Sequence, residues 1–311
     1  MLDAISSRRS VRAYTGTLIP DGSLRKLEAA LAGVSAQYPD IRLTLEQKKP
    51  GDEKLGTYGM IKDAPAFLVM LCRNEKETLL RAGAAMEKAV ILCTALGLGT
   101  CWLGGSFNRK QFSERVSAAP ALVIPAVVAV GVPAEKDGLL RGVVRRVAGS
   151  DNRRSWEDLF FADGFKTPLK RQDDPISVAL EMVRLAPSAS NKQPWRVIRQ
   201  GGVVHFYLAH AQGYEKMPID MQLLDMGIAM AHFEMVMQER EQDGEWTRSD
   251  PALIAPHRTE YISSWTSGAV TPAPAPEPRS VVEEAAAEDP LVAEEDPKTH
   301  EDKIPDDGAE G

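Results

Sequence analysis

Two segments that lie far apart in this 311-residue chain match one another, and this repeat limits the folds that the chain can adopt. Residues 80–87 and residues 224–231 share leucine, glycine, alanine and methionine in register, and each segment opens a long apolar helical stretch. Each also follows a stretch that predicts a strand. Common helix residues can coincide by chance, but the agreement of the flanking elements favours a true duplication.

The remaining periodicity predicts alternating helices and strands. Residues 201–202 (Gly-Gly) separate two apolar runs and predict a hairpin, and Pro187 ends the helix that precedes it. Helices are predicted at 24–32 (ending at Gly33), 78–96, 109–116, 176–185 and 223–239, and strands at 41–45, 66–72, 121–131, 195–198 and 203–208.

The chain divides into two folded halves and a tail. With 43% hydrophobic residues it can bury a sizeable core. We expect a first half over 1–165, a second half over 166–268 that is intertwined with the first, and a disordered tail over 269–311 rich in Pro, Ala and Glu. The tail is strongly acidic, so the net charge of −7 overstates the acidity of the folded part, and the simplest role of the tail is solubility. A body close to neutral argues against a nucleic-acid partner.

Cysteine usage and the absence of a signal-like start predict a cytoplasmic setting. The three cysteines (Cys72, Cys93, Cys101) lack metal-ligand spacing, and their odd number favours reduced thiols. No apolar run is long enough to span a bilayer. We therefore expect neither a metal site nor a membrane partner.

An arginine-rich segment opens the chain. Residues 6–12 (Ser-Ser-Arg-Arg-Ser-Val-Arg) contain three guanidinium groups, which match phosphate oxygens in bidentate fashion. Taken alone, the segment is more typical of a solvated basic N-terminus. Arg153 and Arg154 form a second basic pair that could close over the same phosphate.

A polar turn with two prolines lies late in the chain. Residues 187–195 (Pro-Ser-Ala-Ser-Asn-Lys-Gln-Pro-Trp) place hydroxyl and amide side chains between a helix and a strand. Such a turn suits recognition of a planar heterocycle with alternating donors and acceptors. The alternative is a capped turn above a buried tryptophan.

A glycine-rich loop follows the first long helix. Residues 97–105 (Gly-Leu-Gly-Thr-Cys-Trp-Leu-Gly-Gly) allow backbone amides to approach a ligand closely. No base accompanies Cys101, so we interpret this thiol as buried packing, not as a nucleophile. His232 lies within an apolar helix and is interpreted as a hydrogen-bonded core residue.

These segments together resemble elements of the FMN-dependent nitroreductase family, in particular a branch with two fused nitroreductase-like halves in one chain. The resemblance implies an α+β fold, with a mixed, mainly antiparallel sheet flanked by helices, duplicated into a pseudo-dimer. It implies FMN as cofactor and NAD(P)H as electron donor. It assigns the phosphate and ribityl side to Arg8, Arg9, Ser10, Arg12, Arg153 and Arg154, the ribityl chain and ring to Pro187, Ser188, Ser190, Asn191 and Gln193, and the amides near the flavin N5 to Gly104 and Gly105.

One departure from the family pattern concerns subunits. In ordinary members the proline-flanked turn follows soon after the arginines, whereas here that place holds residues 33–39, which lack the asparagine and tryptophan. The second half has the turn but no arginine cluster of its own. Each half thus carries complementary parts of one site, and we expect a single FMN in a monomeric pseudo-dimer or weak homo-oligomer.

The resemblance implies an FMN-dependent NAD(P)H oxidoreductase that reduces nitroaromatic, quinone or similar small-molecule acceptors by two-electron, ping-pong chemistry. No catalytic side chain is assigned, because the flavin performs the hydride chemistry. The alternative from another class is a non-catalytic FMN-binding protein for storage or regulation. A relative that fragments flavin or dehydrogenates a peptide-derived substrate is a third possibility.

Overall fold

The computed structural model describes residues 1–48, 56–134, 152–214 and 217–268, so the predicted tail lies outside the described residues. Within these ranges no helix is apolar and long enough to cross a bilayer. The helices are α1 (Leu2–Ser7), α2 (Asp21–Gln37), α3 (Lys76–Ala95), α4 (Arg109–Arg115), α6 (Trp156–Leu159), α7 (Pro175–Leu185) and α8 (Met221–Glu239), with a 3-10 turn η1 (Ala189–Asn191). The strands are β1 (Arg42–Gln47), β2 (Ala66–Leu71), β3 (Gly99–Leu103), β4 (Val127–Gly131), β5 (Phe160–Ala162), β6 (Trp195–Gln200), β7 (Val203–Ala209), β8 (Gly244–Thr247) and β9 (Thr259–Ser267).

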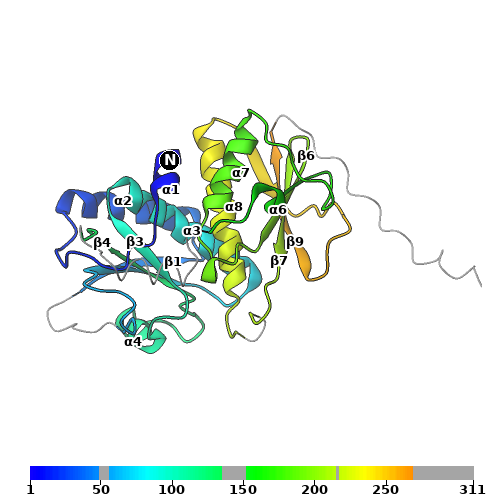
Figure 1. The fold of residues 1–311 in the computed structure, drawn as a ribbon. Helices are drawn as coiled ribbons and strands as arrows, with labels where there is room; N and C mark the ends of the chain where they lie inside the picture. The colour runs from blue at the N-terminus through cyan, green and yellow to red at the C-terminus, as the bar shows by residue number, and fades with distance from the viewer. Residues whose placement is uncertain (49–55, 135–151, 215–216, 269–311) are drawn as a thin grey trace, which may run out of the picture. The chain divides into compact units, whose positions relative to one another are not determined.

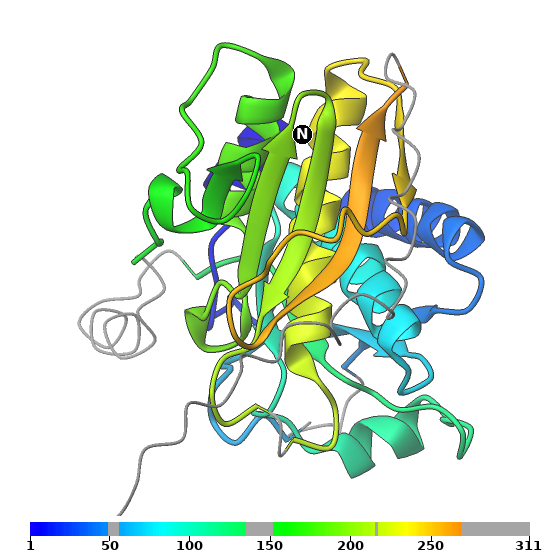
Figure 2. The ribbon, with the colours of Figure 1, turned by 90° about the vertical axis from the view of Figure 1, so that its right-hand side faces the viewer.

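The strands form two sheets, which confirms an α+β fold with mainly antiparallel pairing. The first sheet has the order β1-β2-β4-β3, and the second has the order β5-β6-β7-β9-β8. Every pairing is antiparallel except that of β5 with β6. Helix α8 crosses behind the second sheet, as the face-on view shows (Figure 2).

The two sheets are built in the same way. In chain order, the first half runs α2, β1, β2, α3, β3, β4, and the second runs α7, β6, β7, α8, β8, β9, with α4 as an addition to the first half. Under this correspondence the strand orders β1-β2-β4-β3 and β6-β7-β9-β8 are identical. The shared order supports the internal duplication that the repeat predicts.

Helices α3 and α8 pack against each other through two glycines. A Cβ atom on Gly83 would overlap the backbone carbonyl of Leu224, and one on Gly227 would overlap the carbonyl of Leu80. Leu80 and Leu224 are equivalent in the repeat, as are the two glycines, so the contact is reciprocal, like a two-fold interface within one chain. Figure 1 shows α3 and α8 side by side between the sheets.

The first sheet is buried on both faces, which explains the unbroken apolar run of β2. Leu68 and Met70 pack in the same cluster as α3, whereas Phe67 and Val69 pack in a second cluster with Phe112 of α4. The rings of Phe67 and Phe112 meet edge to face with centroids 5.3 Å apart. A strand covered by helices on both sides needs apolar residues at every position.

Three of the expected elements differ from those observed. Helix α2 continues past Gly33 to Gln37, because Gly33 keeps a helical conformation. The strand predicted at 121–131 is shorter and becomes β4 only at Val127. The glycine-rich loop at 97–105 contains a strand, β3, and only Gly104 onward leaves the sheet. Strands β8 and β9 were not predicted.

Replacing Gly227 with alanine is expected to destabilise the protein by about 3 kcal/mol, because the new methyl group meets a backbone carbonyl that cannot rotate away. The same substitution at Gly33, which has open space around it in α2, is the matched control and is expected to stabilise the protein by about 0.5–1 kcal/mol. Urea unfolding measures both, and equal effects would contradict the close helix contact.

Candidate functional site

A pocket of about 790 Å³ lies between the two halves. Its size is within the range of small-molecule and cofactor sites. The lining comes from the arginine-rich N-terminal segment, the end of β3, Arg153, the turn after α7 and the first turns of α8. Segments that are far apart in sequence therefore share one cavity.

The arginine-rich segment covers the open edge of the first sheet. β3 is an edge strand, and Ser10 forms a parallel bridge with Thr100 while the amide of Val11 donates to the Thr100 carbonyl at 2.8 Å. The Tyr14 hydroxyl donates a hydrogen bond to the Val11 carbonyl oxygen at 2.7 Å and helps to hold the segment in place. Pairing of a strand edge fixes the backbone, so the arginines project from a rigid support.

In two of these guanidinium groups the Nε atom has no hydrogen-bond partner among the described residues. Arg8 and Arg12 line the pocket, and the Nε atom of each is buried without a hydrogen bond among the described residues. A buried donor without a partner costs free energy, more so when it is charged. Such atoms in a pocket point to a ligand that accepts hydrogen bonds from them.

The turn after α7 has an unusual backbone. Ser190, Asn191 and Gln193 have φ values of 48°, 53° and 50°, in the left-handed region that residues with a Cβ seldom adopt. The Ser188 hydroxyl accepts from the Gln193 amide at 2.9 Å and closes the turn. Strain of this kind persists where surrounding contacts enforce it, and it concentrates at ligand sites.

Gln193 does not line the pocket but joins the turn to the segment 152–154. Its side-chain oxygen accepts from the backbone amide of Arg154 at 2.8 Å, and its amide nitrogen donates to the Asn152 carbonyl at 3.2 Å. The side chain is almost fully buried, so these contacts are shielded from water. Gln193 therefore has a positioning role in this structure.

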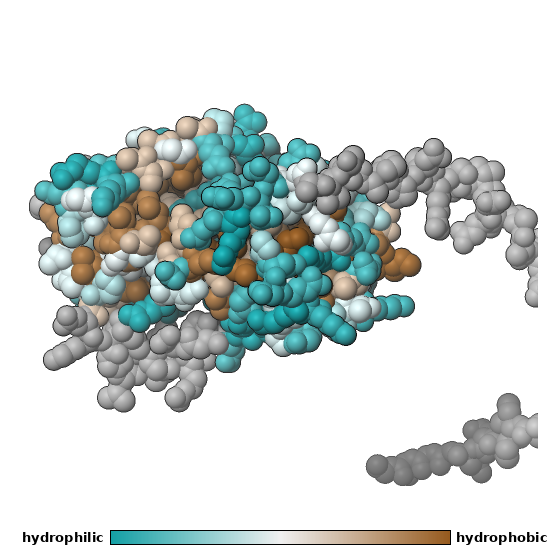
Figure 3. All heavy atoms as spheres, turned by 90° about the horizontal axis from the view of Figure 1, so that it is seen from above, coloured by the Kyte–Doolittle hydropathy of each residue, from teal (hydrophilic) through white to brown (hydrophobic). Residues whose placement is uncertain are grey.

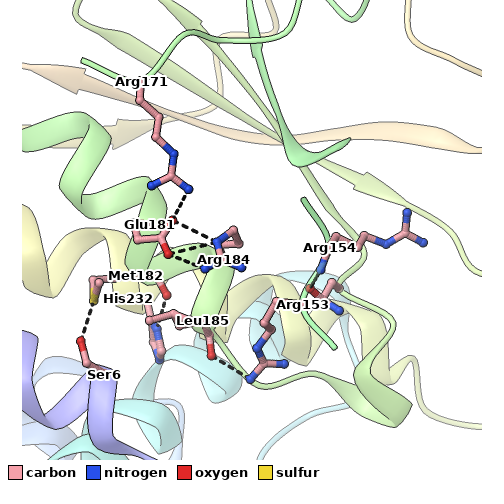
Figure 4. Close-up of polar contacts among 10 residues, drawn as sticks. Ser6, Arg153, Arg154, Arg171, Glu181, Met182, Arg184, Leu185 and His232 are labelled. Carbon is pink, nitrogen blue, oxygen red and sulfur yellow. Dashed lines mark hydrogen bonds and ion pairs between the residues drawn. The ribbon is translucent and has the colours of Figure 1, made fainter. Parts of the chain in front are cut away.

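The two neighbouring arginines have different surroundings. The Arg153 guanidinium lines the pocket and donates to the Asn191 side-chain oxygen at 2.5 Å and to the Leu185 carbonyl at 2.9 Å. The Arg154 side chain is exposed and extends in another direction (Figure 4). Of the two arginines, Arg153 therefore lines the pocket and Arg154 does not.

Gly104 and Gly105 directly follow β3 and line the pocket. The Gly104 carbonyl accepts from the Arg109 guanidinium at 2.6 Å, and the same guanidinium group also donates to the Ile124 and Pro125 carbonyls. A Cβ on Gly105 would meet nothing within 4 Å. Arg109 thus fixes the loop through the Gly104 carbonyl, and the space beside Gly105 is open, so the loop amides can approach a ligand there.

The apolar wall of the pocket comes from α8 and β3. Met221, Leu224 and Ile228 lie on one face of α8. Trp102 adds an aromatic ring, and its indole nitrogen donates to the buried Glu87 at 2.8 Å. This wall keeps water away from one side of a bound molecule.

Behind Trp102, Glu87 continues into a buried network. Glu87 lies 2.9 Å from Nε2 of His232, whose Nδ1 lies 2.8 Å from the Met182 carbonyl oxygen. Because a carbonyl can only accept, Nδ1 of His232 carries a proton. The interpretation of His232 as a hydrogen-bonded core residue is confirmed. Figure 4 shows the imidazole directed at Met182.

One acidic side chain in the lining was missed from the sequence. Asp225 is 3% exposed, and its Oδ1 accepts from the Ala189 amide at 2.9 Å, while Oδ2 is buried with no partner. Burial raises the pKa of the Asp225 carboxyl well above its usual value; the Ala189 amide opposes the rise and the Asp220 carboxylate adds to it. An acid inside the apolar helix stretch 223–233 was the signal available in the sequence.

Cys101 also lines the pocket and is almost fully buried. Burial raises the pKa of its thiol, so the thiolate form that a nucleophile requires is disfavoured. The interpretation of Cys101 as packing agrees with this position. Among the residues that the structure describes, no group of three potential ligands could hold a metal ion.

The structure brings together most of the residues singled out from the sequence. Arg154 and Gln193 are outside the lining, and the others are in it: Arg8, Arg9, Ser10, Arg12, Gly104, Gly105, Arg153, Pro187, Ser188, Ser190 and Asn191. Both halves contribute, as the split-site interpretation requires. On the face seen from above in Figure 1, apolar patches are broken up by hydrophilic ones (Figure 3).

Comparison with known proteins gives consistent matches. Residues 1–237 match the family described as "Putative TM nitroreductase". A "Putative NADH dehydrogenase/NAD(P)H nitroreductase" of Methanothermobacter thermautotrophicus is 30% identical over 152 residues, which are 44% of this chain and 80% of that protein.

One solved structure shares the fold over most of the chain. It is described as a "putative nitroreductase" from Thermotoga maritima and has a TM-score of 0.54 at 18% identity, over 86% of this chain and 92% of that chain. A Bacteroides fragilis nitroreductase, solved with bound FMN, has a TM-score of 0.37 at 21% identity and covers 44% of this chain and 90% of its own. The first of these likenesses establishes a shared fold.

Replacing Arg12 with glutamine is expected to weaken phosphate binding by about tenfold or more, because hydrogen bonds between charged groups are stronger than neutral ones. The measurement is the rise in unfolding temperature that inorganic phosphate produces. Arg184→Gln is the matched control, since Arg184 pairs with Glu181 and is outside the lining. An equal loss in both variants would show that the effect is not specific to the pocket.

Proposed function

The chain belongs to the TM nitroreductase family, and on that premise we propose that it is an FMN-dependent NAD(P)H oxidoreductase. Its acceptors would be nitroaromatic compounds, quinones or similar small molecules, reduced by two electrons in a ping-pong sequence. The observation that carries the proposal is the pocket in which two buried arginine Nε atoms without partners among the described residues, a strained polar turn and a glycine loop meet.

The arginine end of the pocket fits the phosphate of FMN. Arg8 and Arg12 offer buried Nε donors without partners, and Arg9 and Ser10 add further donors from the same rigid segment. Phosphate oxygens accept in the bidentate geometry that a guanidinium offers. Arg153 would close this end from the second half.

The glycine loop, the polar turn and α8 offer groups that suit a planar ring system. The amides of Gly104 and Gly105 would lie near the flavin N5, and Ser188, Ser190 and Asn191 would face the ribityl chain and the ring from the turn. A Cβ on Gly104 would come within 2.5 Å of the Met221 terminal methyl group, so loop and helix lie close together there. The ring would accept hydrogen bonds at its edge from the backbone donors and would pack on apolar residues of α8.

Bound FMN would supply the hydride chemistry, taking two electrons from NAD(P)H and delivering them to the acceptor. The protein's own residues bind and orient. Arginines fix the phosphate, the turn fixes the polar edge of the ligand, and the wall of Met221, Leu224 and Ile228 excludes water from the reacting face. Hydride transfer itself needs no side-chain acid or base, which agrees with the absence of an assigned one.

An asymmetry between the halves supports the proposal of a single site per chain. In the second half the connection between α7 and β6 spans residues 186–194 and carries the polar turn. The equivalent connection in the first half, between α2 and β1, spans only residues 38–41. There Asp40 pairs with Arg81 at 2.7 Å, and Arg81 is the repeat equivalent of Asp225. The equivalent second site therefore lacks its turn.

The purified protein is expected to be yellow, with a single FMN bound per chain. Absorbance and protein quantification measure the ratio, and two FMN per chain would contradict the split-site argument. Arg12 lines the pocket, whereas Arg184 pairs with Glu181 outside the lining. Arg12→Gln is therefore expected to lower FMN occupancy, and Arg184→Gln is expected to leave it unchanged.

Turnover is expected with NADH or NADPH and a quinone or nitroaromatic acceptor. The fall in nicotinamide absorbance at 340 nm follows the steady-state reaction. Parallel lines in double-reciprocal plots indicate ping-pong kinetics. A bound flavin that neither nucleotide reduces would instead support a storage or regulatory protein.

A further inference from the structure

We propose that Asp225 is a neutral carboxylic acid whose Oδ2–H donates a hydrogen bond to a carbonyl oxygen on the planar ring of the ligand in the pocket. The inference rests on the proposed function, since it names a contact of the same site. It assigns a ligand-binding role to a residue that no sequence motif marks.

The two oxygens of Asp225 have different partners. Oδ1 accepts from the Ala189 amide at 2.9 Å and thereby holds the turn that contains η1. The Ala189 carbonyl is held as well, since the Tyr214 hydroxyl donates to it at 3.3 Å. A purely structural Asp225 would be complete with this one bond. Oδ2 is left over, buried and without a hydrogen bond.

No cation offsets a charge on this carboxyl. Within the part of the chain that the structure describes, no ion pair includes Asp225, and the neighbouring charge that acts on it is the Asp220 carboxylate. An unpaired carboxylate in such a place is costly, so the neutral acid is the stable form. A neutral acid whose Oδ1 is already accepting has one remaining function, which is to donate from Oδ2.

The position of Asp225 places that donor near Gly104, where the proposed function puts the planar ring. Asp225 lies one helical turn from Met221 on α8, and Met221 contacts Gly104. Its neighbours on this face, Leu224 and Ile228, are apolar. A planar heterocycle that packs on them can satisfy Oδ2–H only through an atom at its edge, and a ring carbonyl oxygen is the matching acceptor.

Two ligands of the proposed function carry such a carbonyl. The isoalloxazine of FMN has carbonyl oxygens on its pyrimidine edge, and the nicotinamide of NAD(P)H has one in its carboxamide. The chemistry of the contact is the same for both. Separate binding measurements with FMN and with the oxidised dinucleotide distinguish them.

Two substitutions at position 225 test the donor. Asp225→Asn keeps an acceptor for the Ala189 amide and places an N–H where Oδ2 was, so binding should stay within about threefold of wild type. Asp225→Leu removes both oxygen atoms and should weaken binding by about tenfold relative to its control.

The matched control for Asp225→Leu is Gln222→Leu. Gln222 is on the same helix, is equally buried, and accepts from the Ala211 amide at 2.7 Å, but it is outside the pocket lining. Both leucine variants thus lose a bond from a loop amide to α8, and only one loses a pocket donor. Circular dichroism and unfolding midpoints verify that both variants fold.

Binding of FMN to the apoprotein is followed by quenching of flavin fluorescence, and binding of NADP⁺ and NAD⁺ to the FMN-loaded protein by calorimetry. A loss of FMN affinity confined to Asp225→Leu assigns the contact to the isoalloxazine, and a loss of dinucleotide affinity alone assigns it to nicotinamide. Infrared spectroscopy supplies an independent readout, because a protonated-carboxyl C=O band should vanish in Asp225→Asn.

Several results would overturn the inference. A neutral donor is excluded if Asp225→Leu matches Gln222→Leu with every ligand. It is also excluded if Asp225→Asn binds as weakly as Asp225→Leu, or if the infrared band is missing from wild type. Failure of wild-type protein to bind FMN is a separate result, which overturns the proposed function and removes this inference with it.

Discussion

The rest of the structure depends on the contact between α3 and α8. Gly83 and Gly227 let two helix backbones approach so closely that no side chain fits between them. This contact joins the two sheets into one body and sets the end of β3 beside the first turns of α8. The pocket exists because the approach is that close, since its two walls come from different halves.

The site carries electrostatic features that folding alone does not explain. Among the described residues, four arginines line the pocket together with one acid, Asp225. Two guanidinium Nε atoms and one carboxyl oxygen are buried there without partners, and the turn at 190–193 has three left-handed residues. Each feature lowers stability, and native proteins retain such features mainly where a ligand offsets them. The asymmetry between the halves confines them to one of two equivalent places.

The sequence predicted the elements with strong periodicity and the segments with distinctive chemistry. The long helices, the hairpin at Gly201–Gly202 and the α+β class were confirmed, because apolar spacing and glycine turns act locally. Strands β8 and β9 were missed, since their alternation is weak and polar residues such as Ser263 and Ser264 are buried in them. Helix α2 passed through Gly33 because a single glycine costs a helix only about 1 kcal/mol.

By itself, the sequence determined that the chain is duplicated in pattern and that its arginines and its polar turn are in opposite halves. It could not determine which of these side chains share a cavity, because that depends on the helix contact that brings the halves together. Only the tertiary structure separated Arg153 from Arg154, gave Gln193 a positioning role and placed Asp225 in the lining. The physical reason is that burial and hydrogen-bond partners are properties of three-dimensional neighbours, which a local pattern does not specify.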